Sequence, residues 1–78
     1  MIVNIESWVP KPASAFELEI SESEMISSVK AKLETRTGIP ADQIQLYVKR
    51  WSYFLDDKRR VSDYDKIEAG SILKMLYK

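Results

Sequence analysis

The side chains that most often perform chemistry are scarce in this chain. It contains no histidine and no cysteine, so it lacks the commonest general base, the thiol nucleophile and most ligands of transition metals. Asp56 and Asp57 are adjacent carboxylates, but they lie in a turn-forming run with no second acidic cluster to complete an acid/base or metal pair. A glycine-rich phosphate-binding loop is also missing. We therefore expect no enzymatic activity, no cofactor and no metal.

Aromatic rings beside cations are the stronger candidates for a functional surface. The segment RWSYF (50–54) carries three aromatic residues directly after basic ones. Trp51 and Tyr53 could form a recognition patch or a stacking platform for nucleic acid. Alternatively, Phe54 or Leu55 fills the core while Trp51 and Tyr53 partly cover the surface. The next run, DDKRR, reads most simply as a solvated turn.

Length and composition indicate one small globular domain over residues 1–78. The 12 basic and 12 acidic residues balance, which argues against nucleic-acid binding because no excess of cations can release counterions. The sequence has no apolar run near the ~20 residues of a membrane span and no secretion signal at its start. A chain without cysteine forms no disulfide and suits a reducing compartment. We expect a monomer in the cytoplasm or the nucleus, without a membrane partner.

A helix whose apolar face begins at Ile26 is predicted to end by Thr37, and its first residue is left open. The residues at positions 26, 29, 30 and 33 share one face, which consists of three apolar groups and a lysine stem. Ser21 and Ser23 are both candidate N-caps, and Ser21-x-x-Glu24 has the spacing of a capping box. After Thr37, a glycine and then a proline favour termination of the helix.

Strands are predicted on both sides of this helix. Apolar residues alternate with polar or exposed ones around Val3, Phe16, Leu46 and Leu73, the pattern of half-buried strands. Two prolines separate the first two strands, which should form a hairpin with a long tip. The order of elements is typical of an α+β fold with one helix packed on one face of a sheet.

The whole chain resembles ubiquitin and the ubiquitin-like domains. The segment VKAKLETRTGIPADQ at 29–43 has the helix end, glycine stop and Ile-Pro-x-Asp-Gln connection of that family, and VSDY at 61–64 is a second specific match. The resemblance implies a β-grasp fold, a mixed sheet with one α-helix on one face. It also implies that Tyr64 packs inside its loop with its hydroxyl bonded to backbone. The first hairpin loop, the region 50–59 and the surroundings of residue 66 are longer than in ubiquitin.

The C-terminal end departs most from the resemblance. Conjugatable members end in a basic tail with two glycines, whereas this sequence stops at Leu76-Tyr77-Lys78. Trp51 stands where ubiquitin carries its main chain-linking lysine. We expect a domain of a longer protein that is not itself a modifier. A modifier whose tail is missing is the alternative.

The resemblance also points to a binding surface. Partner proteins bind ubiquitin through an apolar patch on the outer face of its sheet. Positively charged side chains surround this patch. The three central positions correspond to Trp8 (or Val9), Tyr47 and Leu76. The rim corresponds to Gln45, Lys49, Arg50 and Lys74. Alternation independently predicts that Tyr47 and Leu76 face outward, and exposed aromatic groups beside cations are typical of interface hot spots. The alternative is that these are ordinary, scattered surface side chains without a binding role.

These observations lead to one expected function and its alternatives. We expect a non-catalytic binding module that docks its parent protein to ubiquitin-interacting helices, ubiquitin-associated domains or receptors of the proteasome. The ubiquitin-proteasome pathway is an implication of the resemblance alone. Besides the trimmed modifier, a β-grasp scaffold that packs inside its own parent protein is a further possibility.

Overall fold

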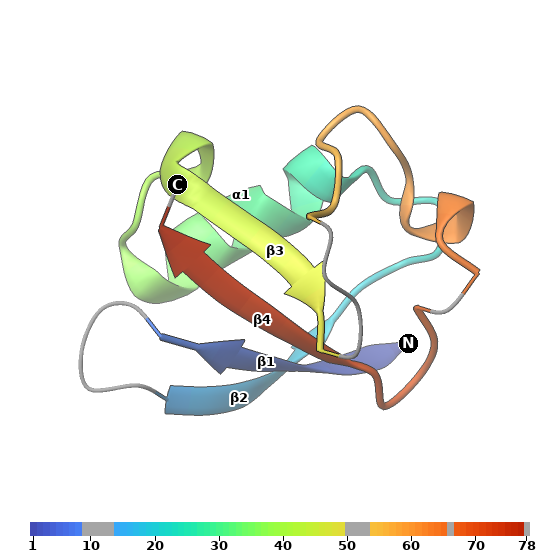
Figure 1. Cartoon of the computed structure of the whole chain (residues 1–78), viewed down its shortest axis with the longest axis horizontal. Helices are drawn as coiled ribbons and strands as arrows, with labels where there is room; N and C mark the ends of the chain where they lie inside the picture. Colours follow the sequence, from blue (N-terminus) through green and yellow to red (C-terminus); the bar gives the residue numbers. More distant parts are fainter. Residues whose placement is uncertain (9–13, 50–53, 66, 78) are drawn as a thin grey trace.

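The sheet is mixed, with its first and last strands paired at the centre. The computed structural model describes residues 1–8, 14–49, 54–65 and 67–77. Its strands are β1 (Ile2–Ser7), β2 (Ser14–Glu19), β3 (Ile44–Val48) and β4 (Ile72–Tyr77), in the order β2-β1-β4-β3. β1 pairs antiparallel with β2 and parallel with β4, and β3 pairs antiparallel with β4 (Figure 1).

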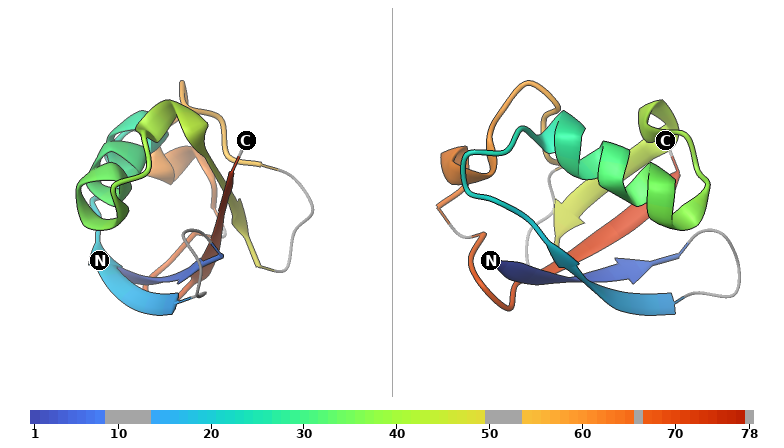
Figure 2. Two further views of the ribbon diagram at one scale, coloured as in Figure 1. Left: turned by 90° about the vertical axis from the view of Figure 1, so that its left-hand side faces the viewer. Right: turned by 180° about the vertical axis from the view of Figure 1, so that it is seen from behind.

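One α-helix covers one face of this sheet. Helix α1 (Ile26–Thr37) lies behind the sheet in Figure 1 and in front of it in the reverse view of Figure 2. Two short 3-10 helices, η1 (Ala41–Gln43) and η2 (Val61–Asp63), lie in the connections. The predicted α+β architecture, a β-grasp with one helix on a mixed sheet, is therefore confirmed.

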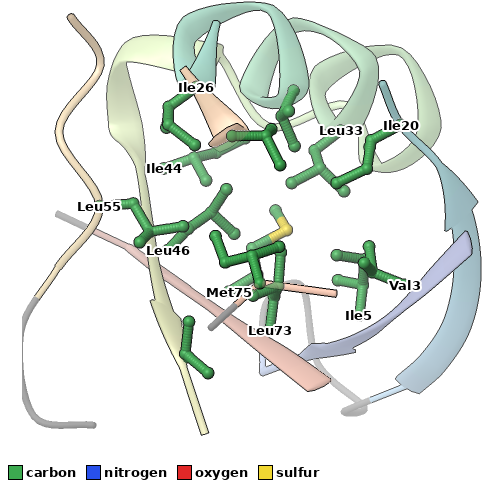
Figure 3. Close-up of a cluster of buried hydrophobic side chains, with 14 of the residues drawn as sticks. Val3, Ile5, Ile20, Ile26, Leu33, Ile44, Leu46, Leu55, Leu73 and Met75 are labelled. Atoms are coloured by element: carbon green, nitrogen blue, oxygen red, sulfur yellow. The ribbon is translucent and has the colours of Figure 1, made fainter. Parts of the chain in front are cut away.

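The core lies between α1 and the inner face of the sheet (Figure 3). Alternate strand residues point into it: Val3, Ile5, Leu46, Leu73 and Met75 are each at most 1% exposed. The helix contributes the face that its spacing predicts, which consists of Ile26, Val29, Lys30 and Leu33. Because strand side chains alternate in direction, the residues between these core positions face away from α1.

The prediction that a serine side chain caps the helix is wrong. Neither Ser21 nor Ser23 caps α1, and no side chain in the described part of the chain bonds its first turn as a cap. Instead, the N–H of Ile26 donates to the carbonyl of Arg59 at 2.8 Å. Ser21 and Glu24 do interact, but before the helix begins: the Ser21 N–H donates to a Glu24 carboxylate oxygen at 3.0 Å. A backbone partner from a distant loop therefore replaces the expected local cap.

The predicted end of the helix is correct. Gly38 follows Thr37 with a φ of 81° and donates its N–H to the carbonyl of Glu34 at 2.7 Å. That positive φ is accessible to glycine without a Cβ clash.

The turn after β3 is tied to the rest of the molecule at two points. The Lys30 ammonium, on the buried face of α1, is bonded to the Asp57 carboxylate at 2.5 Å. The Tyr64 hydroxyl accepts the N–H of Asp56 at 2.8 Å, as the resemblance implies. The run 56–60 is a turn with mostly exposed side chains, as predicted, but Asp57 also serves as the partner of a buried cation.

Candidate functional site

Six of the seven predicted patch residues, all except Arg50, come together on the side of the sheet opposite α1. We call this surface the outer face and define it by Glu6, Trp8, Gln45, Tyr47, Lys49, Phe54, Lys74 and Leu76. Strand register sets their order. Tyr47 on β3 lies opposite Lys74 on β4, which in turn lies beside Glu6 on β1. The outer face is turned toward the viewer in Figure 1.

Trp8 and Lys74 form one half of this surface. Trp8 directly follows β1, and its N–H donates to the carbonyl of Met75 at 3.2 Å. The Lys74 ammonium lies over the Trp8 ring, 5.3 Å from its centroid, within the range of a cation–π interaction. Trp8 is 49% exposed, so it remains open to a partner. An aromatic side chain and a cation therefore lie next to each other on this surface.

Tyr47 and Phe54 form the aromatic half. Their ring centroids are 5.7 Å apart with an interplanar angle of 89°, the edge-to-face arrangement that aromatic pairs favour. The N–H of Leu55 donates to the carbonyl of Leu46 at 2.8 Å, and Leu55 is 3% exposed whereas Phe54 is 49% exposed. Of the two residues that the sequence left open as core candidates, Leu55 fills the core and Phe54 extends the outer face.

Glu6 is an outer-face residue that the patch prediction missed. The Lys49 ammonium on the β3 side reaches across β4 and lies 3.2 Å from the Glu6 carboxylate. Lys49 is therefore partly neutralised, and it offers a partner less positive charge than the sequence suggests. The alternation of Glu6 with buried Ile5 and Ser7 signals its direction. Only the tertiary arrangement shows which cation it meets.

Leu76 and Gln45 complete the outer face. They lie opposite each other on β4 and β3, and both are partly buried. Leu76 therefore supplies an aliphatic surface on the row next to Tyr47 and Lys74. The predicted residues Arg50, Trp51 and Tyr53, and the alternative Val9, lie outside the described residues.

The described residues provide no group suited to hold a metal ion. No set of three or more His, Cys, Asp or Glu side chains converges within the described ranges. A shallow hollow is lined by Glu6, Ser7, Trp8, Ser14 and Ala15 at the end of the first hairpin, and it contains a single carboxylate. In the described part of the chain, no helix is long and apolar enough to cross a membrane. The outer face therefore combines aromatic, aliphatic and cationic side chains, a composition typical of interface hot spots.

The fold and its outer face define a ubiquitin-like β-grasp domain, a class that is generally non-catalytic. Residues 3–78 match the model of the ubiquitin family, and the chain belongs to that family. It is also similar to the "Ubiquitin-like protein NEDD8-like protein 1" of Dictyostelium discoideum, with 28% identity over 60 residues. The similar region covers 77% of this chain and 60% of that protein.

Proposed function

We propose that this ubiquitin-like domain is a non-catalytic protein-binding module that docks through its outer face to proteins that recognise ubiquitin. The observation that supports the proposal is the contiguity of Trp8, Lys74, Tyr47 and Phe54 across neighbouring strands. Rings held in place by neighbours lose little conformational freedom on binding and bury much apolar area.

The chemistry of the outer face fits a short amphipathic helix with acidic residues. Its apolar side chains would cover Tyr47, Phe54 and Leu76, and an acidic side chain would meet the Lys74 ammonium. Ubiquitin-interacting helices, ubiquitin-associated domains and receptors of the proteasome are the partners we propose. In that role the domain acts as an adaptor in the cytoplasm or the nucleus for a larger protein.

A titration with a ubiquitin-interacting helix tests this function. Isotopically labelled domain is followed by amide shifts, and saturable changes are expected around Trp8, Tyr47, Lys74 and Leu76. Tyr47→Ala should weaken binding by about 1–2 kcal/mol if the ring is an anchor. Tyr77→Ala is the matched control, because Tyr77 is an exposed ring at the end of β4 that alternates with the outer-face positions. Absence of shifts at millimolar helix would reject the docking function and leave the fold unaffected.

A conjugatable modifier is the second candidate, and its support is the similarity to a NEDD8-like protein. Conjugation needs a C-terminal diglycine that an activating enzyme can adenylate. Mass spectrometry of the natural protein recovered from its cells separates the two functions. A C-terminal diglycine, or a covalent adduct to another protein, would favour the modifier, and further folded sequence after Lys78 would favour the docking module.

A further inference from the structure

The side of the sheet opposite α1 carries opposite charges on its two halves. Among the described residues, the charged side chains that β1 and β2 direct to this side are all acidic: Glu6, Glu17 and Glu19. The charged outer-face residues on β4 and directly after β3, Lys74 and Lys49, are basic. A partner that is acidic throughout therefore matches only the half formed by β3 and β4, because the potentials of two binding surfaces need to be complementary.

A hollow lies beside Glu6, between the end of β1 and the start of β2. Its lining consists of Glu6, Ser7, Trp8, Ser14 and Ala15, which belong to these two strands or directly follow β1. Figure 1 shows that β1 ends next to the beginning of β2. The volume of the hollow is about 240 Å³, below the roughly 300–1,000 Å³ of pockets that hold small molecules. Its size therefore suits one side chain of a partner better than a whole small molecule.

The lining of this hollow suits a cationic side chain with an aliphatic stem. Trp8 is half exposed and Ala15 is exposed, so both offer apolar surface to the stem of a lysine or arginine. Glu6 supplies the single carboxylate of the lining. The Lys49 ammonium bonds Oε2 of Glu6, and within the described ranges Oε1 has no hydrogen-bond partner. Because a carboxylate accepts hydrogen bonds on both oxygens, Glu6 can bind a second cation while it keeps Lys49.

A partner that covers Glu6 has to supply a matching side chain. The Glu6 side chain is 29% exposed, and a docked partner would remove water from its carboxylate. A buried carboxylate is costly unless it is paired. An acidic side chain in the hollow would be repelled, and an apolar one would leave Oε1 without a bond. The Glu17 carboxylate, two residues along β2 from Ala15 and on the same side, adds to the negative potential.

One row of side chains crosses the four strands and leads to the hollow. Tyr47, Lys74, Glu6 and Ala15 are successive register neighbours on β3, β4, β1 and β2. Neighbouring strands lie about 4.8 Å apart, so the space between β1 and β2 lies roughly 7 Å from β4. Residues four positions apart on a helix are about 6 Å apart along its axis. A helix that crosses the strands can therefore place an apolar residue over Tyr47, an acidic one over Lys74 and a basic one over the hollow at successive turns.

We propose that the hollow binds a lysine or arginine side chain of the docking helix, one turn after the acidic residue that meets Lys74. This site rests on the proposed docking function and adds a charge pattern to it. The resemblance to ubiquitin implies a patch surrounded by positive charge, which favours an acidic partner. The Glu6 carboxylate changes this requirement on the β1 side, so the domain selects helices with an apolar, an acidic and a basic residue in that order. The order of acidic before basic also stabilises the helix itself.

The test is a titration of labelled domain with three forms of a ubiquitin-interacting helix, which carry lysine, norleucine or glutamate one turn after the acidic residue. We expect the lysine peptide to bind about threefold to fivefold more tightly than the norleucine peptide, and the glutamate peptide to bind most weakly. Norleucine keeps the stem without the charge, so it isolates the contribution of the ammonium. Amide shifts at Tyr47 report docking in all three titrations, whereas only the lysine peptide should shift the Ala15 amide to saturation.

Domain variants separate the effect of charge from the effect of space. Glu6→Gln should abolish the preference for lysine over norleucine. Ala15→Leu keeps every charge but puts a larger side chain into the hollow, and it should abolish the preference as well. Glu68→Gln removes an exposed carboxylate outside the sheet and should leave the preference unchanged. The same peptides are used with each variant, so differences in the helicity of the free peptides cancel.

The titrations distinguish failure of this site from failure of the docking function. Equal binding of the lysine and norleucine peptides rejects the site, and so does a preference that survives Glu6→Gln or Ala15→Leu. In these cases saturable shifts at Tyr47 leave the docking function intact. Absence of binding by all three peptides at millimolar concentration rejects both the site and the docking function.

Discussion

The Lys30 ammonium and the Asp57 carboxylate join α1 to the turn after β3, at a distance of 2.5 Å. The two ends of this pair are not equivalent, because the Lys30 side chain is 5% exposed and the Asp57 side chain is 44% exposed. Removal of Lys30 and removal of Asp57 therefore leave different charged groups unpaired, in different surroundings. An unpaired ammonium would be stranded in the core, whereas an unpaired carboxylate could turn to water.

That asymmetry gives the first prediction. Asp57→Ala should lower the free energy of unfolding by about 2–3 kcal/mol, because it leaves a buried charge without its partner. Lys30→Met should cost less, since methionine refills the space of the stem and Asp57 is solvated. Urea unfolding of both variants and of the double variant measures the difference. A larger loss for Lys30→Met than for Asp57→Ala would contradict this account.

Phe54 and Leu55 give the second prediction, because these adjacent residues lie on opposite sides. Leu55→Ala should cost roughly 2–5 kcal/mol of stability, the range for truncating a buried leucine. Phe54→Ala should cost about 1 kcal/mol through loss of the edge-to-face contact with Tyr47, and it should also weaken binding of a ubiquitin-interacting helix. Thermal unfolding and the helix titration report the two effects separately. Equal destabilisation by both substitutions would refute the assignment of Phe54 to the surface.

Gly38 gives the third prediction. Its φ is 81°, and a Cβ built at this position meets nothing within 4 Å, so the cost of a side chain comes from backbone conformation alone. Gly38→Ala should lower the free energy of unfolding by about 1 kcal/mol. Gly38→Asn should cost less, because asparagine tolerates the left-handed region better than alanine. Chemical denaturation ranks the three proteins, and an alanine variant as stable as the parent would exclude a conformational role for this glycine.

Local patterns in the sequence were sufficient for the fold and for the direction of most patch residues. Alternation about Leu46 and Leu73 places Tyr47, Lys74 and Leu76 on the outer face, because a strand side chain has only two directions. The helix and its glycine end were also predictable, since their signals lie within a few residues of one another. Phe54 and Leu55 stayed ambiguous because the run from Arg50 to Leu55 does not show which of the two continues the alternation.

Contacts between distant segments were beyond prediction. Lys49 meets Glu6 across 43 positions of sequence, and Lys30 meets Asp57 across 27. Both depend on how the elements are arranged in three dimensions, which periodicity does not encode. The serine caps failed for the same reason, because the carbonyl of Arg59 takes the N–H at the start of the helix. The charge on the outer face was overestimated, since the contact between Lys49 and Glu6 was not foreseen.

Glu24 gives the last prediction, a dependence of stability on pH. Partial burial works to raise the pKa of Glu24, but hydrogen bonds from Lys32, the Ser21 N–H and Ser28 outweigh it and hold this pKa below its ordinary value of 4.5. The unfolded chain then binds more protons than the folded one in this range, so the free energy of unfolding falls as the pH falls from about 4.5 through the lower folded value. Glu24→Gln should flatten that part of the profile, measured by urea unfolding between about pH 6 and pH 3.

The exposed neighbour Glu22 supplies the control, because Glu22→Gln removes a carboxyl that is not part of these hydrogen bonds. An unchanged slope in Glu24→Gln would show that these hydrogen bonds do not favour the charged form.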